Sequence, residues 1–323
     1  MKDVKRQASE LPVVPSERTG VPTCDPNVIP PEDVTILAEL GLSVGHRLKR
    51  GRYGVVYEGH FTEAFSMQKL TTRQLHYLFV RPEQNGANGD MRAGRKFAVK
   101  FCDIESRKAY HIEDIEQRLQ QEVNFVRRVS YDVSTAVVRV YCVLATKPSR
   151  YYMLMELADD NLQCVINSYG SKNRQMPAQH VLAVYECLLA TVRSLHQQKL
   201  TYGMMRTSNI LVFGQTNAAA KDNPVTDEPP FRVKIADFVR SLDMDAAGVA
   251  PSLVDDAIEE DLDDLYYVHS ELFTLARFDF AKYQAFKESL KVMTDINAQR
   301  NSVATIDKVL ELVSKFAREL QQA

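Results

Sequence analysis

The separation of β-like segments in the first half of the chain from helical segments in the second half constrains the fold more than any other feature. Residues 45–59 (GHRLKRGRYGVVYEG) alternate like two strands around a glycine-containing turn, and residues 96–101 (KFAVKF) and 151–157 (YYMLMEL) indicate further strands. Two long segments in the second half, residues 176–198 and 302–322, instead repeat apolar residues at helical spacing. The sequence therefore predicts an α+β protein with a small β-rich lobe and a mainly helical lobe.

Residues 1–33 differ from the rest of the chain because six prolines interrupt them and no periodic apolar pattern develops. We expect a flexible Pro-rich tail here and a single folded domain over residues 34–323. Within that domain, one lobe is expected over about residues 42–157 and the other over about residues 158–323. A polar insertion separates Gly59 from Lys96, and PEQNGANGD is its most evident loop.

Composition and charge exclude several classes of protein. The chain of 323 residues is 45% hydrophobic and 25% charged, as in ordinary folded domains, and its formal net charge of -2 gives no global attraction to nucleic acid or anionic lipid. No apolar run is long enough to cross a membrane, and five widely spaced cysteines without a C-x-x-C pair indicate free thiols. We therefore expect a cytoplasmic or nuclear protein without nucleic-acid or membrane partners. A secreted protein without its signal peptide would have the same pattern.

A series of short motifs follows in the order and spacing of a known fold. The motifs are a glycine turn at 51–54, a lysine-ended strand at 96–101, a helix at 111–128 with an inward glutamate, N-I-L at 209–211, A-D-F at 236–238 and DLDDLYYV at 261–268. This series resembles the protein kinase fold over about residues 42–275. Residues 151–166 and 192–212 are most similar to the casein kinase 1 group. The resemblance implies a bilobal protein-kinase-like fold with a shortened C-lobe.

The resemblance also implies a nucleotide site between the lobes. Lys100 matches the lysine that binds the α- and β-phosphates and pairs with a helix glutamate, for which Glu122 is the first candidate and Glu116 the second. Glu122 lies on an apolar helical stripe, where an unpaired carboxylate would be costly. Met155 matches the gatekeeper position. By resemblance, the nucleotide-binding residues are Gly51, Gly54, Val56, Ala98, Lys100, Glu122, Met155, Glu156 and Leu157.

Lys49 stands where the first glycine of the phosphate-covering loop is expected. Together with Arg47, Arg50 and Arg52, it makes this loop unusually basic. These cations either contact phosphates or point to solvent, and we expect the arginines to be solvated.

The catalytic loop departs most clearly from the family pattern. Alignment on Asn209 places Tyr202, Gly203 and Met204 at the three signature positions, so that methionine replaces the aspartate that would accept the substrate proton. The resemblance therefore assigns no catalytic residue. A positioned base contributes ~10²- to 10⁴-fold, so this loss alone leaves residual transfer open. Arg206 matches a position where many kinases have a lysine that contacts the γ-phosphate.

The metal site and the activation segment give opposite indications. Asn209 and Asp237 match the magnesium ligands, and both offer hard oxygens. However, Val239 replaces the glycine after Phe238, a change that we expect to lock the aspartate into or out of the site. Only 23 residues separate Asp237 from Asp261, which matches the helix F aspartate that holds the catalytic loop, and no A-P-E-like anchor lies between them. A platform for peptide substrates is thus expected to be missing.

These observations predict a pseudokinase that acts as a binding, scaffold or allosteric protein, with ATP and Mg as ligands of the retained site. One alternative is an unorthodox active phosphotransferase that acts on itself or on a non-peptide substrate. Another is a scaffold that binds no nucleotide. The expected partner is a protein, and the candidate contact surfaces are the Pro-rich tail, the insertion between Gly59 and Lys96 and the amphipathic C-terminal helix.

Overall fold

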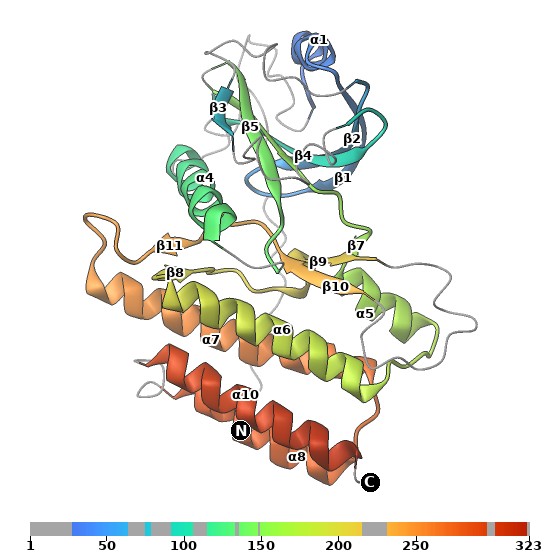
Figure 1. Cartoon of the computed structure of the whole chain (residues 1–323), viewed down its shortest axis with the longest axis vertical. Helices are drawn as coiled ribbons and strands as arrows, with labels where there is room; N and C mark the ends of the chain where they lie inside the picture. Colours follow the sequence, from blue (N-terminus) through green and yellow to red (C-terminus); the bar gives the residue numbers. More distant parts are fainter. Residues whose placement is uncertain are drawn as a thin grey trace, which may run out of the picture.

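The structure, a computed structural model, separates a β-rich lobe from a helical lobe, as the sequence predicts (Figure 1). It describes residues 28–63, 75–78, 92–105, 115–132, 136–147, 149–214, 231–295 and 301–321. Most of the predicted tail, the PEQNGANGD loop and residues 215–230 lie outside the described residues. None of the described helices is both long enough and apolar enough to span a membrane.

The first lobe contains a six-stranded antiparallel sheet in the order β1-β2-β4-β6-β5-β3. Its strands are β1 (Leu42–Arg50), β2 (Val55–Phe61), β3 (Leu75–Leu78), β4 (Lys96–Asp103), β5 (Val140–Lys147) and β6 (Arg150–Met155). The predicted glycine turn joins β1 to β2, and the predicted FAVK strand is β4. Strand β3, which the sequence analysis did not expect, comes from the polar insertion and adds an edge to the sheet next to β5.

Helix α4 (Ile115–Asp132) lies beside the sheet and reaches toward the second lobe (Figure 1). Apolar side chains at helical spacing, among them Ile115, Val123 and Val126, are buried on the face that was predicted from the sequence. This face also carries Glu122, which is 1% exposed. The helix thereby brings a carboxylate into the space between sheet and helix.

Helix α1 (Pro31–Glu39) begins inside the segment predicted as a tail. A proline at the first helical position has its φ already set for a helix and lacks an N–H that would otherwise stay unpaired. Asp33 is fully buried and accepts hydrogen bonds from the hydroxyls of Tyr152 (2.6 Å) and Thr146 (2.8 Å). The helix is therefore fastened to the sheet, and the predicted boundary at residue 34 falls within it.

The second lobe is a stack of helices under two small sheets (Figure 1). Its helices are α5 (Leu162–Ser171), α6 (Ala178–Gln197), α7 (Pro251–Leu272), α8 (Phe280–Ser289) and α10 (Ser302–Gln321), with 3₁₀ turns at Thr207–Asn209, Phe273–Leu275 and Leu290–Thr294. The strands are β7 (Asp160–Asn161), β8 (Leu200–Thr201), β9 (Ile210–Phe213), β10 (Arg232–Ile235) and β11 (Leu242–Asp243). Strands β7, β9 and β10 form one sheet, and β8 and β11 form the other.

The C-terminal helix α10 packs on α6 along its predicted apolar stripe. Ile306, Val309 and Val313 of this helix are fully buried. The apolar face that was a candidate contact surface for a partner is therefore used inside the lobe, which is the alternative expected of an amphipathic helix on its own core.

Candidate functional site

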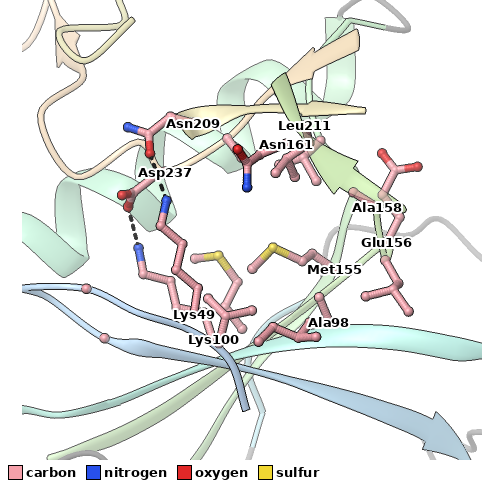
Figure 2. Close-up of a pocket in the computed structure, with 18 of the residues that line it drawn as sticks. Lys49, Ala98, Lys100, Met155, Glu156, Ala158, Asn161, Asn209, Leu211 and Asp237 are labelled. Carbon is pink, nitrogen blue, oxygen red and sulfur yellow. Dashed lines mark hydrogen bonds and ion pairs between the residues drawn. The ribbon is translucent and has the colours of Figure 1, made fainter. Parts of the chain in front are cut away.

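A pocket of about 280 Å³ lies between the two lobes, close to the lower end of the roughly 300–1,000 Å³ that small-molecule sites occupy (Figure 2). All eleven residues predicted to bind nucleotide or metal line it, which are Gly51, Gly54, Val56, Ala98, Lys100, Glu122, Met155, Glu156, Leu157, Asn209 and Asp237. Sequence motifs more than 180 residues apart therefore meet in one cavity.

The pocket also has lining residues that the sequence analysis did not assign. Among them are Val138, Asn161 and Leu211. Leu211 belongs to β9, which begins directly after the 3₁₀ turn that ends at Asn209. Asn161 carries a different role, since its side chain caps α5 by accepting a hydrogen bond from the Cys164 amide at 3.1 Å.

One end of the pocket is an apolar slot that leads to the segment between β6 and β7. Val56 and Ala98 of the sheet form one wall and Leu211 forms the other. Within the part of the chain that the structure describes, no group is hydrogen-bonded to the backbone amides of Leu157 and Ala158. A flat apolar slot next to unpaired backbone groups suits a planar heteroaromatic ring that both donates and accepts hydrogen bonds.

The other end of the pocket carries a buried network of charges. The Lys100 ammonium is 2.7 and 2.8 Å from the two Glu122 carboxylate oxygens and 2.8 Å from Asp237 Oδ1. Lys100 is 8% exposed. The predicted ion pair with Glu122 is thus confirmed. Glu116, the alternative partner, lies on the exposed side of α4.

The network shifts the pKa values of its members in ways that have clear causes. Burial disfavours the charged form of Lys100, but the charges of Asp237 and Glu122 outweigh it and raise the pKa of the ammonium. Burial likewise disfavours the charged form of Asp237, yet the adjacent Lys100 holds the pKa of that carboxyl below its ordinary value. Burial raises the pKa of Glu122 despite the charge of Lys100. Lys100 and Asp237 are therefore ionised at neutral pH.

The glycine turn approaches Lys100 so closely that it leaves no room for a side chain. A Cβ atom at Gly54 would lie 2.9 Å from the carbonyl oxygen of Phe101 and 3.2 Å from the Lys100 side chain. Arg52 lines the pocket, whereas Arg47 and Arg50 are exposed residues outside its lining. Arg52 is exposed as well, so the expectation of solvated arginines is met by all three arginines.

The A-D-F segment holds its aspartate inside the pocket. Asp237 has a φ of +70°, a conformation that aspartate tolerates better than most residues, while Val239 is fully buried and has no positive φ. Phe238 stacks on Phe125 of α4, with ring centroids 4.7 Å apart. Of the two outcomes expected from valine at position 239, the structure shows the one with the aspartate turned in.

Asp261 on α7 holds the backbone of the catalytic loop, as the sequence predicts. Its carboxylate accepts hydrogen bonds from the amides of Tyr202 (2.8 Å) and Gly203 (2.6 Å) and contacts His196 Nε2 at 2.9 Å. Met204 follows directly, and its carbonyl oxygen accepts a hydrogen bond from the Asn209 side chain at 3.3 Å. The loop is therefore braced although the side chain at its signature position is a thioether.

Gly203, which stands where the family has an arginine, lies in close contact with the segment after Phe238. Its φ is +74°, and a Cβ atom there would lie 2.7 Å from the carbonyl oxygen of Arg240. The segment after Phe238 packs directly on this glycine, because Ser241 Oγ donates to the Tyr202 carbonyl oxygen at 2.9 Å and β11 pairs with β8. The activation segment is thus a short connection that ends where α7 begins, at Pro251.

Arg206 does not take the position that was expected from its alignment. It lines a second, shallower cavity of about 530 Å³ together with Asp264, Tyr267 and Glu271, and not the pocket between the lobes. In this structure Arg206 therefore does not line the pocket in which a γ-phosphate would be bound. A 3₁₀ turn at Thr207–Asn209 separates Arg206, which lines the second cavity, from Asn209, which lines the pocket between the lobes.

Comparison with known proteins supports the assignment that the geometry suggests. Curated proteins provide no match to the chain. A family model described as the protein kinase domain matches residues 89–254, which is more than half of the 323 residues. With its two lobes, its buried lysine–glutamate pair and its braced catalytic loop, the chain belongs to the protein kinase domain family.

Proposed function

We propose that the chain is a pseudokinase, which binds a nucleotide and acts as a binding, scaffold or allosteric protein instead of phosphorylating protein substrates. The observation that carries the proposal is the contrast within one site, where Lys100, Glu122 and Asp237 form a complete network beside Met204. A thioether cannot take a proton from a substrate hydroxyl, so the family's general-base step has no side chain to perform it.

The segment that would present a peptide supports the same proposal. Between Phe238 and Pro251 the chain packs on Gly203 and pairs with β8, and it forms no separate platform. Two losses on the substrate side, the base and the platform, argue more strongly against peptide phosphorylation than either loss does alone. The retained nucleotide side argues for binding.

The proposed ligand is ATP, because the pocket combines a heteroaromatic slot with a cationic end. Kinase domains generally bind ATP in this place, and the unpaired amides of Leu157 and Ala158 lie where an adenine edge would be read. At the other end, Lys100 provides a charged donor for phosphate oxygens.

Thermal melting with and without ATP, combined with mass detection of phosphate transfer, tests the proposal. Binding to the native state at 100 times the dissociation constant adds about 2.7 kcal/mol of stability, so saturating ATP should raise the melting temperature of the wild type. The proposal expects this rise without any phosphate on the protein or on peptides. Asp237→Ala is the control for phosphate transfer, since it removes a charged group of the site.

The second candidate function is an unorthodox phosphotransferase, which the same intact network favours. Phosphate transfer that occurs in the wild type and disappears in Asp237→Ala would establish this alternative and end the pseudokinase proposal. A wild type that shows neither transfer nor a shift with any nucleotide would instead favour a scaffold without a nucleotide.

Three finer assignments belong to the same proposal. Tyr202 at the start of the catalytic loop and the DLDDLYYV segment at 261–268 place the chain nearest the casein kinase 1 group. Free thiols at Cys142 and Cys187 suit a reducing compartment, so we place the protein in the cytoplasm or nucleus. The partner is a protein, and with the C-terminal helix occupied by its own lobe, the tail and the insertion remain as contact surfaces.

A further inference from the structure

Lys49 enters the nucleotide pocket from the position of the missing first glycine. It is the last residue but one of β1, and its side chain crosses from the β-rich lobe to the catalytic loop. The ammonium lies 3.0 Å from the carbonyl oxygen of Ser208 and 3.2 Å from Asn209 Oδ1. Figure 2 shows the Lys49 and Lys100 side chains reaching the same end of the pocket, toward Asn209 and Asp237.

This arrangement places a cation on each of the two side chains expected to bind magnesium. Asn209 Oδ1 accepts from Lys49 and Asp237 Oδ1 accepts from Lys100, so both oxygens already have a charged donor. Magnesium requires near-octahedral oxygen ligands at about 2.0–2.1 Å and would have to displace or repel these ammonium groups. The residues at this end of the pocket therefore do not fit the metal that the family implies.

The charge balance at this end leads to the same conclusion. Two ammonium groups, Lys49 and Lys100, face two carboxylates, Glu122 and Asp237, so no net negative charge is left to hold a divalent cation. Among the described residues, no cluster of three or more acidic, histidine or cysteine side chains is suited to a metal ion.

The two lysines differ in how their charges are balanced. Lys100 is neutralised by two carboxylates, whereas the groups that hold Lys49 are a backbone carbonyl and a side-chain amide, both of which are uncharged. An ammonium has three N–H donors, and Lys49 uses two of them on these oxygens. One donor thus remains on an ammonium that has no carboxylate among its direct hydrogen-bond partners, and an anion in the cavity would complete the set.

We propose that Lys49 replaces the metal ion, so that the pocket binds a nucleoside di- or triphosphate without a divalent cation. This inference rests on the proposed nucleotide binding and assigns its phosphate recognition. Lys49 supplies a charge-assisted donor to phosphate oxygens and at the same time joins the glycine turn to the catalytic loop. The ligand is the free nucleotide, in contrast to the magnesium complex that active members of the family use.

Isothermal titration with ATP, ADP and adenosine, each in EDTA and in excess magnesium, tests this assignment on the full chain. Wild type should bind ATP at least as tightly in EDTA as in magnesium. Lys49→Met should weaken the binding of ATP and ADP in EDTA by about tenfold to a hundredfold, the range for a lost charge-assisted hydrogen bond, and leave adenosine unchanged. In this variant magnesium should strengthen ATP binding, because the competing ammonium is gone.

Arg50→Met is the matched control, since it removes the same charge from the next residue of β1, outside the lining of the pocket. Its ATP affinity should stay within about twofold of wild type, as expected for an exposed charge. Melting curves without ligand establish that both variants are folded.

The outcomes separate the inference from the proposed function. Wild-type ATP binding that requires magnesium, or Lys49→Met binding equal to wild type in EDTA, overturns the role of Lys49 and leaves a nucleotide-binding pseudokinase. Absence of binding by every nucleotide in both buffers overturns nucleotide binding itself, and the inference with it.

Discussion

Two cavities adjoin the catalytic loop and share Ser208, but they differ in how deeply their side chains are buried. In the pocket between the lobes, Lys100 and Glu122 are almost fully buried and fully paired. In the second cavity, Arg206 is exposed and Tyr267 is 66% exposed. Charges that are buried in pairs support the fold, whereas exposed side chains can change at little cost. The nucleotide motifs therefore have a structural reason to persist that does not depend on catalysis.

The largest effect expected from this comparison follows the removal of Lys100. Lys100→Met leaves the buried Glu122 carboxylate without its cation, and breaking a buried pair in this way typically costs roughly 3–5 kcal/mol. Urea denaturation measures the change in the free energy of unfolding.

Lys96→Met provides the control on the same strand. Lys96 is 63% exposed and pairs with Glu58 at 2.8 Å, so its loss should cost about 1 kcal/mol or less. Equal effects of the two substitutions would show that burial of the Lys100 network contributes nothing to stability, and the comparison would fail.

The next largest effect concerns the glycine that replaces the family's arginine. Gly203→Ala forces a side chain into positive φ and against the Arg240 carbonyl oxygen, whereas Gly214→Ala meets the same backbone problem at φ +85° with no atom of the described residues within 4 Å of the added Cβ. Gly214→Ala should cost roughly 1–2 kcal/mol for the left-handed backbone alone. Gly203→Ala should cost roughly 1–3 kcal/mol more because of the overlap.

Differential denaturation of the two alanine variants isolates the contact between the catalytic loop and the activation segment. If Gly203→Ala and Gly214→Ala lose the same stability, the segment yields to a side chain at position 203, and the family's arginine could be accommodated there. A larger loss at Gly203 means that the short activation segment and the glycine depend on each other.

Much of this fold follows from local patterns in the sequence. The strand pattern of β1, β2 and β4 and the helical spacing of the apolar residues in α10 are visible in the sequence. These elements could be predicted without knowing which elements they pack against. The first residues of helix α1 were placed in the tail because of the prolines at its start. The burial of Asp33 depends on Tyr152, more than a hundred residues away, and no local signal reports such a contact.

The site shows the same division between local and distant information. The ion pair of Lys100 with Glu122 could be predicted because a carboxylate on an apolar stripe requires a cation. The direction of Lys49 could not, because it depends on how the glycine turn approaches the catalytic loop across the two lobes. The cavity that Arg206 lines could not be predicted for a related reason, since alignment gives the position of a residue along the loop but not which of two adjoining cavities it lines.

The smallest expected effect is a pH dependence of the fold's stability that arises from Asp264 of α7, which lines the second cavity. Its Oδ2 accepts the Met205 amide at 2.8 Å, and burial raises the pKa of the carboxyl to about 6, with Glu260 and Asp261 adding to the rise and Arg206 opposing it. A carboxyl with a pKa raised above its unfolded value stabilises the fold while protonated, and this contribution is lost as the pH rises through about 6.

Asp264→Asn keeps an oxygen for the Met205 amide and removes the titration, so the variant should gain stability relative to wild type as the pH rises from about 4 to about 6. The gain should level off near 1 kcal/mol, because the side chain is partly exposed and solvent screens its charge. Free energies of unfolding from urea denaturation at matched pH values give the difference directly. His269, whose pKa burial lowers to about 4, contributes equally to both proteins and cancels. A stability difference that is constant with pH would mean that Asp264 has the same pKa in the folded and the unfolded protein, and that burial next to the catalytic loop does not disfavour its charge.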